Sequence, residues 1–342
     1  MFRFGTVSSI ARTAAIFTWL LTGSIASPAG AWDWFPTDQE MQRFRQSWNP
    51  LTHGPLLLSP ADLQAEGRWL FWSFAYGQVT DGRFGNTMTT TGSGRPFHQD
   101  VLTPGAVLFY GLTDHVTVGV SAAVVSWDSD RLSAGNRSAG RVNATGLDDI
   151  GLIVKTRHIV QDPDGWRPTV GTYGRISLPA SRWTGAHEIP GGFVPITPRP
   201  ITRAGALSFT EGPLLRKNFE PFRVSAMMTY TYNAPGSEGG QTVYPGDILD
   251  ARLGVEYVVD ETKGFGLIWD AVVQNGLPYR LDGHAINTEF KSFTLIGTAV
   301  AVEYRFSRDF LASCGILFTL AGRNNVDAIY PGFSMKYYWG KE

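Results

Sequence analysis

The sequence has a single cysteine and almost no net charge, and both scarcities exclude classes of protein. Cys314 has no partner for an internal disulfide, so a small scaffold held together by disulfides is excluded. A formal net charge of -1 over 342 residues offers no basic surface, so no nucleic-acid partner is predicted. Beyond the N-terminal segment, no uninterrupted apolar run approaches the ~20 residues of a membrane-spanning helix. A helical membrane protein is therefore not expected.

Sequence motifs that carry enzymatic or metal chemistry are also missing. The six histidines have no H-E-x-x-H or similar metal-ligand spacing, and five of them fall in or beside expected turns and loops. Neither a G-x-S-x-G motif nor a P-loop occurs. We therefore predict no catalytic residue, no cofactor and no metal site. One enzymatic alternative stays open, because a lipid-modifying barrel can place a Ser/His pair on its rim without closeness in sequence.

The chain divides into three regions. Residues 1–31 combine two arginines, a short apolar run and a small-residue A-x-A cleavage site, which predicts a signal peptide. The alternative, a membrane-anchoring helix, is disfavoured because the apolar run is too short. Residues 32–66 show little alternation, and we predict a periplasmic extension or a partial plug. Residues 67–342 are predicted to form the main domain.

The main domain alternates apolar and polar residues with a period of two, and its connections are alternately short and long. In an outer-membrane barrel one strand face contacts lipid and the other faces the lumen, while periplasmic turns stay short. The pattern predicts an all-β fold: a transmembrane antiparallel up-and-down β-barrel of about 12 strands. The predicted strands are residues 67–78, 101–110, 115–127, 146–158, 167–178, 203–217, 222–233, 246–259, 264–276, 292–306, 310–321 and 330–339.

Three strands are harder to assign. Both faces of 67–78 are apolar, so its facing is undecided, and Pro104 weakens the strand 101–110 because proline cannot donate to a ladder. The alternation of 203–217 slips near Glu211, which predicts a bulge. The competing fold is a secreted or periplasmic sandwich or lipocalin-like barrel with apolar faces inside. It is disfavoured because aromatic residues recur at strand ends on the apolar side, as interfacial girdles require.

The inward faces carry charges of both signs. A structural interpretation is that these side chains form salt bridges that fill and narrow the lumen. A functional interpretation is that they line a polar conduction path. Equal numbers of each sign argue against a strongly ion-selective pore, which needs rings of one sign. The residues predicted to line the lumen are Asp149, Lys155, Arg157, Arg175, Asp250, Arg252, Glu256, Asp270, Glu303 and Arg305.

Several of these strand and turn segments resemble a known family. Residues 111–120 and 146–157 are similar to the "G-L-T-D…G-V" and "G-x-x-D-x-x-L-x-x-K-x-R" signatures of outer-membrane proteins labelled as MetA-pathway phenol-degradation proteins. Residues 215–219 and 257–260 are similar too. The resemblance implies an outer-membrane barrel linked to uptake of small hydrophobic or aromatic compounds. It carries over no catalytic residues.

Three functions follow from this pattern. The leading prediction is an outer-membrane channel or transporter for passive uptake of small, hydrophobic or aromatic compounds, in a Gram-negative bacterium. Its partners would be outer-membrane lipid and a small-molecule solute, and the oligomeric state is left open. The second is a plugged structural or interaction barrel whose loops 80–100 and 179–202 meet partners. The third is an outer-membrane lipid-modifying enzyme.

Overall fold

A computed structural model describes most of the main domain and part of the segment before it. The predicted signal peptide and most of the loop 179–202 lie outside the described residues. The described residues are 34–50, 52–93, 95–132, 138–163, 165–180, 207–238, 241–278, 280–281, 284–285 and 292–341.

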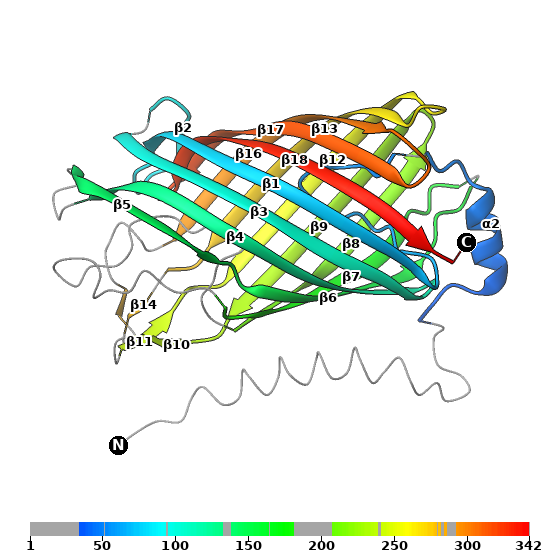
Figure 1. Cartoon of the computed structure of the whole chain (residues 1–342), viewed down its shortest axis with the longest axis horizontal. Helices are drawn as coiled ribbons and strands as arrows, with labels where there is room; N and C mark the ends of the chain where they lie inside the picture. The colour runs from blue at the N-terminus through cyan, green and yellow to red at the C-terminus, as the bar shows by residue number, and fades with distance from the viewer. Residues whose placement is uncertain are drawn as a thin grey trace, which may run out of the picture.

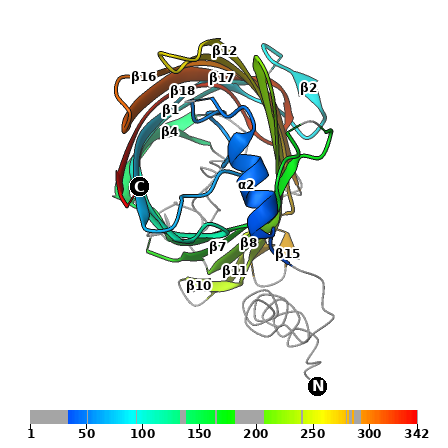
Figure 2. The same ribbon diagram turned by 90° about the vertical axis from the view of Figure 1, so that its right-hand side faces the viewer.

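A closed antiparallel β-barrel of 12 strands forms the described main domain (Figures 1 and 2). Each strand pairs with its neighbour in the chain, and β1 (Arg68–Arg83) pairs with β18 (Val326–Gly340) to close the cylinder. The predicted barrel fold is confirmed. The other wall strands are β3 (Arg95–Thr113), β4 (Val116–Leu132), β6 (Ile150–Ile159), β7 (Thr169–Leu178), β8 (Ser208–Phe219), β9 (Phe222–Asn233), β12 (Ile248–Asp260), β13 (Phe265–Gly276), β16 (Phe293–Arg305) and β17 (Phe310–Arg323).

One position in the wall is shared by two strands. β6 pairs with the first part of β4, and β5 (Ser138–Leu147) pairs with its last part. Between them, the Asp148 amide donates to the Ala123 carbonyl at 2.8 Å, and the Asp148 carboxylate accepts from the Asp149 amide at 2.8 Å. Shorter strands lie at the loops: β2 (Thr89–Thr90), β10 (Gly236–Glu238), β11 (Gln241–Tyr244), β14 (Arg280–Leu281) and β15 (His284–Ala285).

The outward faces of the strands form an apolar belt. On β13, Leu267, Trp269 and Val273 are exposed, whereas Ile268 and Asp270 between them are buried. Because the side-chain period of a strand is two, this alternation places one complete face against lipid. The competing fold with its apolar faces inside is therefore wrong.

Aromatic rings collect on this belt at the end where the turns are short. The Trp69 and Trp339 rings stack with centroids 6.1 Å apart, and the Tyr337 and Trp339 centroids are 5.8 Å apart. Such rings sit at the membrane interface in barrels. Among the described residues, no helix is both long enough and apolar enough to span a membrane.

Several predicted boundaries were wrong, because the wall strands continue into segments that look like polar loops. β1 ends at Arg83 and β3 begins at Arg95, which leaves a much shorter loop than residues 80–100. Likewise, β4 runs to Leu132, and β5 occupies part of the predicted loop 128–145. Polar residues continue a strand there because backbone pairing with the neighbour does not depend on side-chain polarity.

The two strands of uncertain facing are resolved by burial. Leu70 of β1 is buried and Phe71 is exposed, so the even-numbered side chains of β1 point inward as far as Thr80, after which the register shifts. β8 has no bulge at Glu211, because its ladders with β7 and β9 keep one register throughout. The polarity pattern slips there because charged Glu211 shares the outward face with Leu215, whereas apolar Leu214 points inward. Inward positions of β8 include Leu214 and Arg216.

Candidate functional site

A helix lies across the opening at the short-turn end of the barrel. α2 (Asp38–Gln46) begins with a capping box, in which the Thr37 side chain accepts from the Glu40 amide and Glu40 accepts from the Thr37 amide. The Thr37 bonds lower the pKa of Glu40. Figure 2 shows α2 inside the outline of the barrel when viewed along it.

Ion pairs fasten α2 to two wall turns. Arg45 pairs with Asp114 in the β3–β4 turn, and Arg167 in the β6–β7 turn pairs with Glu40 at 3.1 Å. These pairs are partly exposed, so each is worth about 1 kcal/mol or less. The helix is therefore held weakly by charge.

Residues 47–50 and 52–66, here the inner segment, continue from α2 into the lumen. Arg223 of β9 donates to the Thr52 carbonyl at 2.9 Å and to the Pro50 carbonyl at 3.1 Å. The same guanidinium pairs with Glu256 of β12 at 3.1 Å, and both side chains are almost completely buried. A buried cation on the wall thus binds backbone carbonyls of the inner segment.

A buried carboxylate on β13 also binds the backbone of the inner segment. The Asp270 carboxylate of β13 accepts from the amides of Leu56 and Leu57, at 3.0 Å and 3.1 Å. Arg252 of β12 donates to the Leu57 carbonyl and pairs with Asp250, with an Nε to Oδ1 distance of 2.6 Å. The Leu56 and Leu57 backbone groups that lose contact with water here therefore have charged partners.

His53 connects the inner segment to the strands that close the barrel. Its amide donates to Glu303 of β16, and its Nδ1 shares a 2.7 Å hydrogen bond with the Tyr338 hydroxyl of β18. Burial, followed by the charges of Lys336, Lys155, Arg223 and Arg216, holds the pKa of His53 well below its ordinary value.

The last part of the inner segment crosses to the other side of the lumen. Lys155 of β6 donates to the Asp62 carbonyl at 2.7 Å, and Arg216 of β8 pairs with the Asp62 carboxylate. The Gln64 amide donates to the Thr117 hydroxyl of β4 at 2.9 Å. Two cations from different strands therefore converge on one aspartate of the inner segment.

The structure brings six of the ten predicted lumen residues together around the inner segment. Four of them bond it directly, and Glu256 and Asp250 act through Arg223 and Arg252. The six are Lys155, Asp250, Arg252, Glu256, Asp270 and Glu303.

The other four predicted residues lie apart from that group. Arg157 is buried below α2, with its guanidinium 5.1 Å from the centre of the Phe44 ring. Arg305 donates to the Arg308 carbonyl at the short-turn end. Asp149, at the break between β5 and β6, accepts from the Ala180 amide at 3.3 Å. Arg175 of β7 is half-buried.

The predicted lumen-lining set leaves out three inward cations, of which only Arg223 was placed on an inward face from the sequence. Arg216, Arg223 and Lys336 are all nearly fully buried. The signal for Lys336 was present, because it alternates with Met335 and Tyr337, which face outward. Arg216 was hidden by the apparent slip of β8. Lys336 lies 3.9 Å from Glu303 and 5.2 Å from the Trp72 ring centre.

Sequence reasoning also missed an apolar half of the lumen. The buried side chains of Leu70, Val107, Phe109 and Ile153 form one cluster, against which Trp72, Phe74, Tyr173 and Tyr338 pack. Most of these belong to β1 and β3. The sequence signal for this cluster was the first strand, both of whose faces are apolar. One face contacts lipid and the other contacts this cluster.

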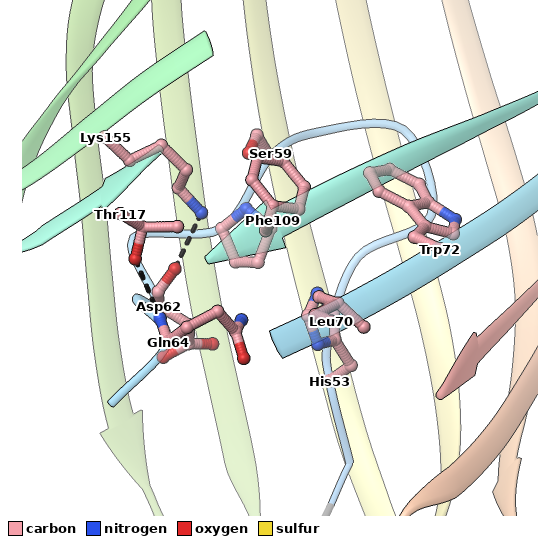
Figure 3. A pocket seen from close by; sticks show the side chains of 10 residues that line it. His53, Ser59, Asp62, Gln64, Leu70, Trp72, Phe109, Thr117 and Lys155 are labelled. Carbon is pink, nitrogen blue, oxygen red and sulfur yellow. Dashed lines mark hydrogen bonds between the residues drawn. The ribbon is translucent and has the colours of Figure 1, made fainter. Parts of the chain in front are cut away.

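A small cavity separates the inner segment from this apolar half (Figure 3). Its volume of about 10 Å³ has room for about one water molecule. Figure 3 shows Lys155 and Thr117 bonded to Asp62 and Gln64 beside the Phe109 ring. The cavity is lined by His53, Ser59, Pro60, Asp62, Gln64, Leu70, Trp72, Phe109, Thr117 and Lys155.

The described residues contain no group of three or more His, Cys, Asp or Glu placed to hold a metal ion. The polar atoms around the cavity are instead arranged to bind the backbone of the inner segment, and they face an aromatic wall.

The fold has known structural relatives. An outer membrane channel from Pseudomonas putida F1 is similar with a TM-score of 0.63 and 12% sequence identity, over 82% of this chain and 100% of that chain. Two weaker similarities are the translocator domain of autotransporter NalP from Neisseria meningitidis (TM-score 0.42, 15% identity, 81% and 90% covered) and the NanC porin (0.41, 10%, 78% and 98%). No family model and no curated protein sequence matches the chain. The first similarity supports an outer-membrane barrel fold.

Proposed function

We propose that this protein is an outer-membrane channel of a Gram-negative bacterium for passive uptake of small hydrophobic or aromatic compounds. The observation that carries this proposal is the division of the lumen. Charged side chains hold the inner segment against one part of the wall, and the inner faces of β1 and β3 present aromatic and aliphatic side chains instead. A wall of that composition suits an apolar solute.

Passage requires the inner segment to move, because the cavity of about 10 Å³ is far smaller than an aromatic ring. The ladders that close the barrel run between wall strands and not through the inner segment, so its displacement leaves the barrel intact. The similarity of the fold to the Pseudomonas putida channel is consistent with conduction. The resemblance to phenol-degradation proteins stays a prediction.

The test uses the purified full chain in planar bilayers and in a liposome swelling assay with small solutes that lipid excludes. We expect measurable conductance and swelling. The variant L56C/A301C in a C314S background allows two states to be compared, with and without a disulfide between the new cysteines. These positions suit a disulfide because Leu56 and Ala301 share a buried cluster. Oxidation should lock the inner segment to β16 and abolish flux, and reduction should restore it.

Failure of every solute to pass, in both redox states, would overturn the channel function. The alternative, a plugged barrel that only meets partners through its loops, predicts that result. C314S alone is the control for the background substitution, because Cys314 is exposed on the outer face of β17.

A further inference from the structure

The cavity beside the inner segment is lined by two chemically different kinds of side chain. Leu70, Trp72 and Phe109 are apolar and bring two aromatic rings, whereas His53, Asp62 and Lys155 are polar. A site of this kind binds a ligand that has a flat apolar body and a polar end.

Cations dominate the polar side of the cavity. The Lys155 ammonium lies 5.9 Å from the centre of the Phe109 ring, and the Lys336 ammonium lies 5.2 Å from that of Trp72. Burial is the first cause of the lowered pKa of His53, and the charges of these lysines, Arg223 and Arg216 lower it further. The polar end of a matching ligand is therefore an anion.

Asp62 already fills the anion position. Its carboxylate pairs with Arg216 and its carbonyl accepts from Lys155 at 2.7 Å. Movement of the inner segment would remove both acceptors and leave two buried cations unpaired, which is strongly unfavourable. A ligand that brings its own carboxylate would restore the pairing.

We propose that this cavity is the binding site for a small aromatic carboxylate, and that Asp62 occupies its anion-binding half until the ligand replaces it. The proposal rests on the channel function, since the ligand reaches the cavity through the lumen. The ring packs against Leu70, Trp72 and Phe109, and the carboxylate binds Lys155 and Arg216. Because the ligand binds only the displaced state, it shifts the inner segment toward that state.

The site also predicts which molecules are rejected. A neutral aromatic alcohol of the same size leaves the two cations unpaired, and acetate leaves the aromatic wall unfilled. Benzoate should therefore bind more tightly than benzyl alcohol and more tightly than acetate. One charge-assisted hydrogen bond corresponds to about tenfold or more in affinity.

Calorimetric titration of the purified full chain with benzoate, benzyl alcohol and acetate at pH 6 measures this order directly. D62N removes the internal competitor for Arg216, and we expect benzoate affinity to rise about tenfold. K155M should lower it about tenfold by removing one cation. E66Q is the matched control, because it neutralises a nearby exposed carboxylate of the inner segment and should leave the affinity unchanged.

Bilayer recordings separate this proposal from the channel function. Benzoate binding with no conductance for any solute would leave the site intact and overturn the channel. Conductance with equal affinities for benzoate and benzyl alcohol, or with no response to D62N and K155M, would overturn the site and leave the channel. D62N and K155M both retain Arg216, so the test does not depend on a variant that loses that buried guanidinium.

Discussion

Replacement of Arg223 by methionine is expected to destabilise the barrel strongly. The guanidinium is 1% exposed and pairs with Glu256, which is 0% exposed, across an Nη1 to Oε2 distance of 3.1 Å. R223M would leave that carboxylate buried without its cation. Loss of one partner of a buried pair costs about 3–5 kcal/mol. Arg223 also binds the carbonyls of Pro50 and Thr52, so the inner segment loses two anchors as well.

Equilibrium unfolding in urea, with the protein in lipid vesicles and followed by tryptophan fluorescence, measures this free energy. The double variant R223M/E256M removes both charges and should recover most of the lost stability, because no unpaired charge remains. K263M is the control: it breaks the exposed Lys263–Asp260 pair, whose N to O distance is 3.2 Å, and should leave the free energy of unfolding nearly unchanged. Two results would refute the reasoning: R223M as stable as K263M, or the double variant as unstable as R223M.

Three further outcomes follow from the structure. Leu253 lies on the lipid face, so L253R should lower the free energy of unfolding from the bilayer by about 2–4 kcal/mol, and a much smaller effect is expected for L253A. The pKa of His53 is lowered on folding, so the stability that its neutral form contributes is complete above about pH 6.5. That contribution is lost as the pH falls toward the folded-state pKa of His53. H53N should therefore reduce the change in urea unfolding midpoint between pH 7.5 and pH 5. A Cβ on Gly111 would lie 2.0 Å from the Ala65 carbonyl oxygen, so G111A should displace the end of the inner segment and raise its cleavage rate by added protease.

The sequence alone determined the barrel and its sidedness. On strands such as β9 and β12 the alternation of apolar and polar residues is uninterrupted. Successive side chains of a strand point to opposite faces, so the sequence is enough to assign each residue to the outward or the inward face. Phe222–Asn233 was predicted with its observed bounds for this reason. The alternation also placed Lys155, Asp270 and Glu303 on the inward faces, where they are buried, and Arg252, which is half-buried.

Only the tertiary structure decided what those inward charges contact. The two-residue period of a strand predicts which face a side chain lies on. It does not predict which charges meet across the lumen, or the path of a segment that has no periodicity. The inner segment has no regular hydrogen-bond ladder, so its backbone groups bond to the side chains of Arg223, Asp270 and Lys155. These residues are far from the inner segment in the sequence. Closure of the cylinder creates those contacts, and it also decides which of the two apolar faces of β1 contacts lipid and which faces the aromatic side of the lumen.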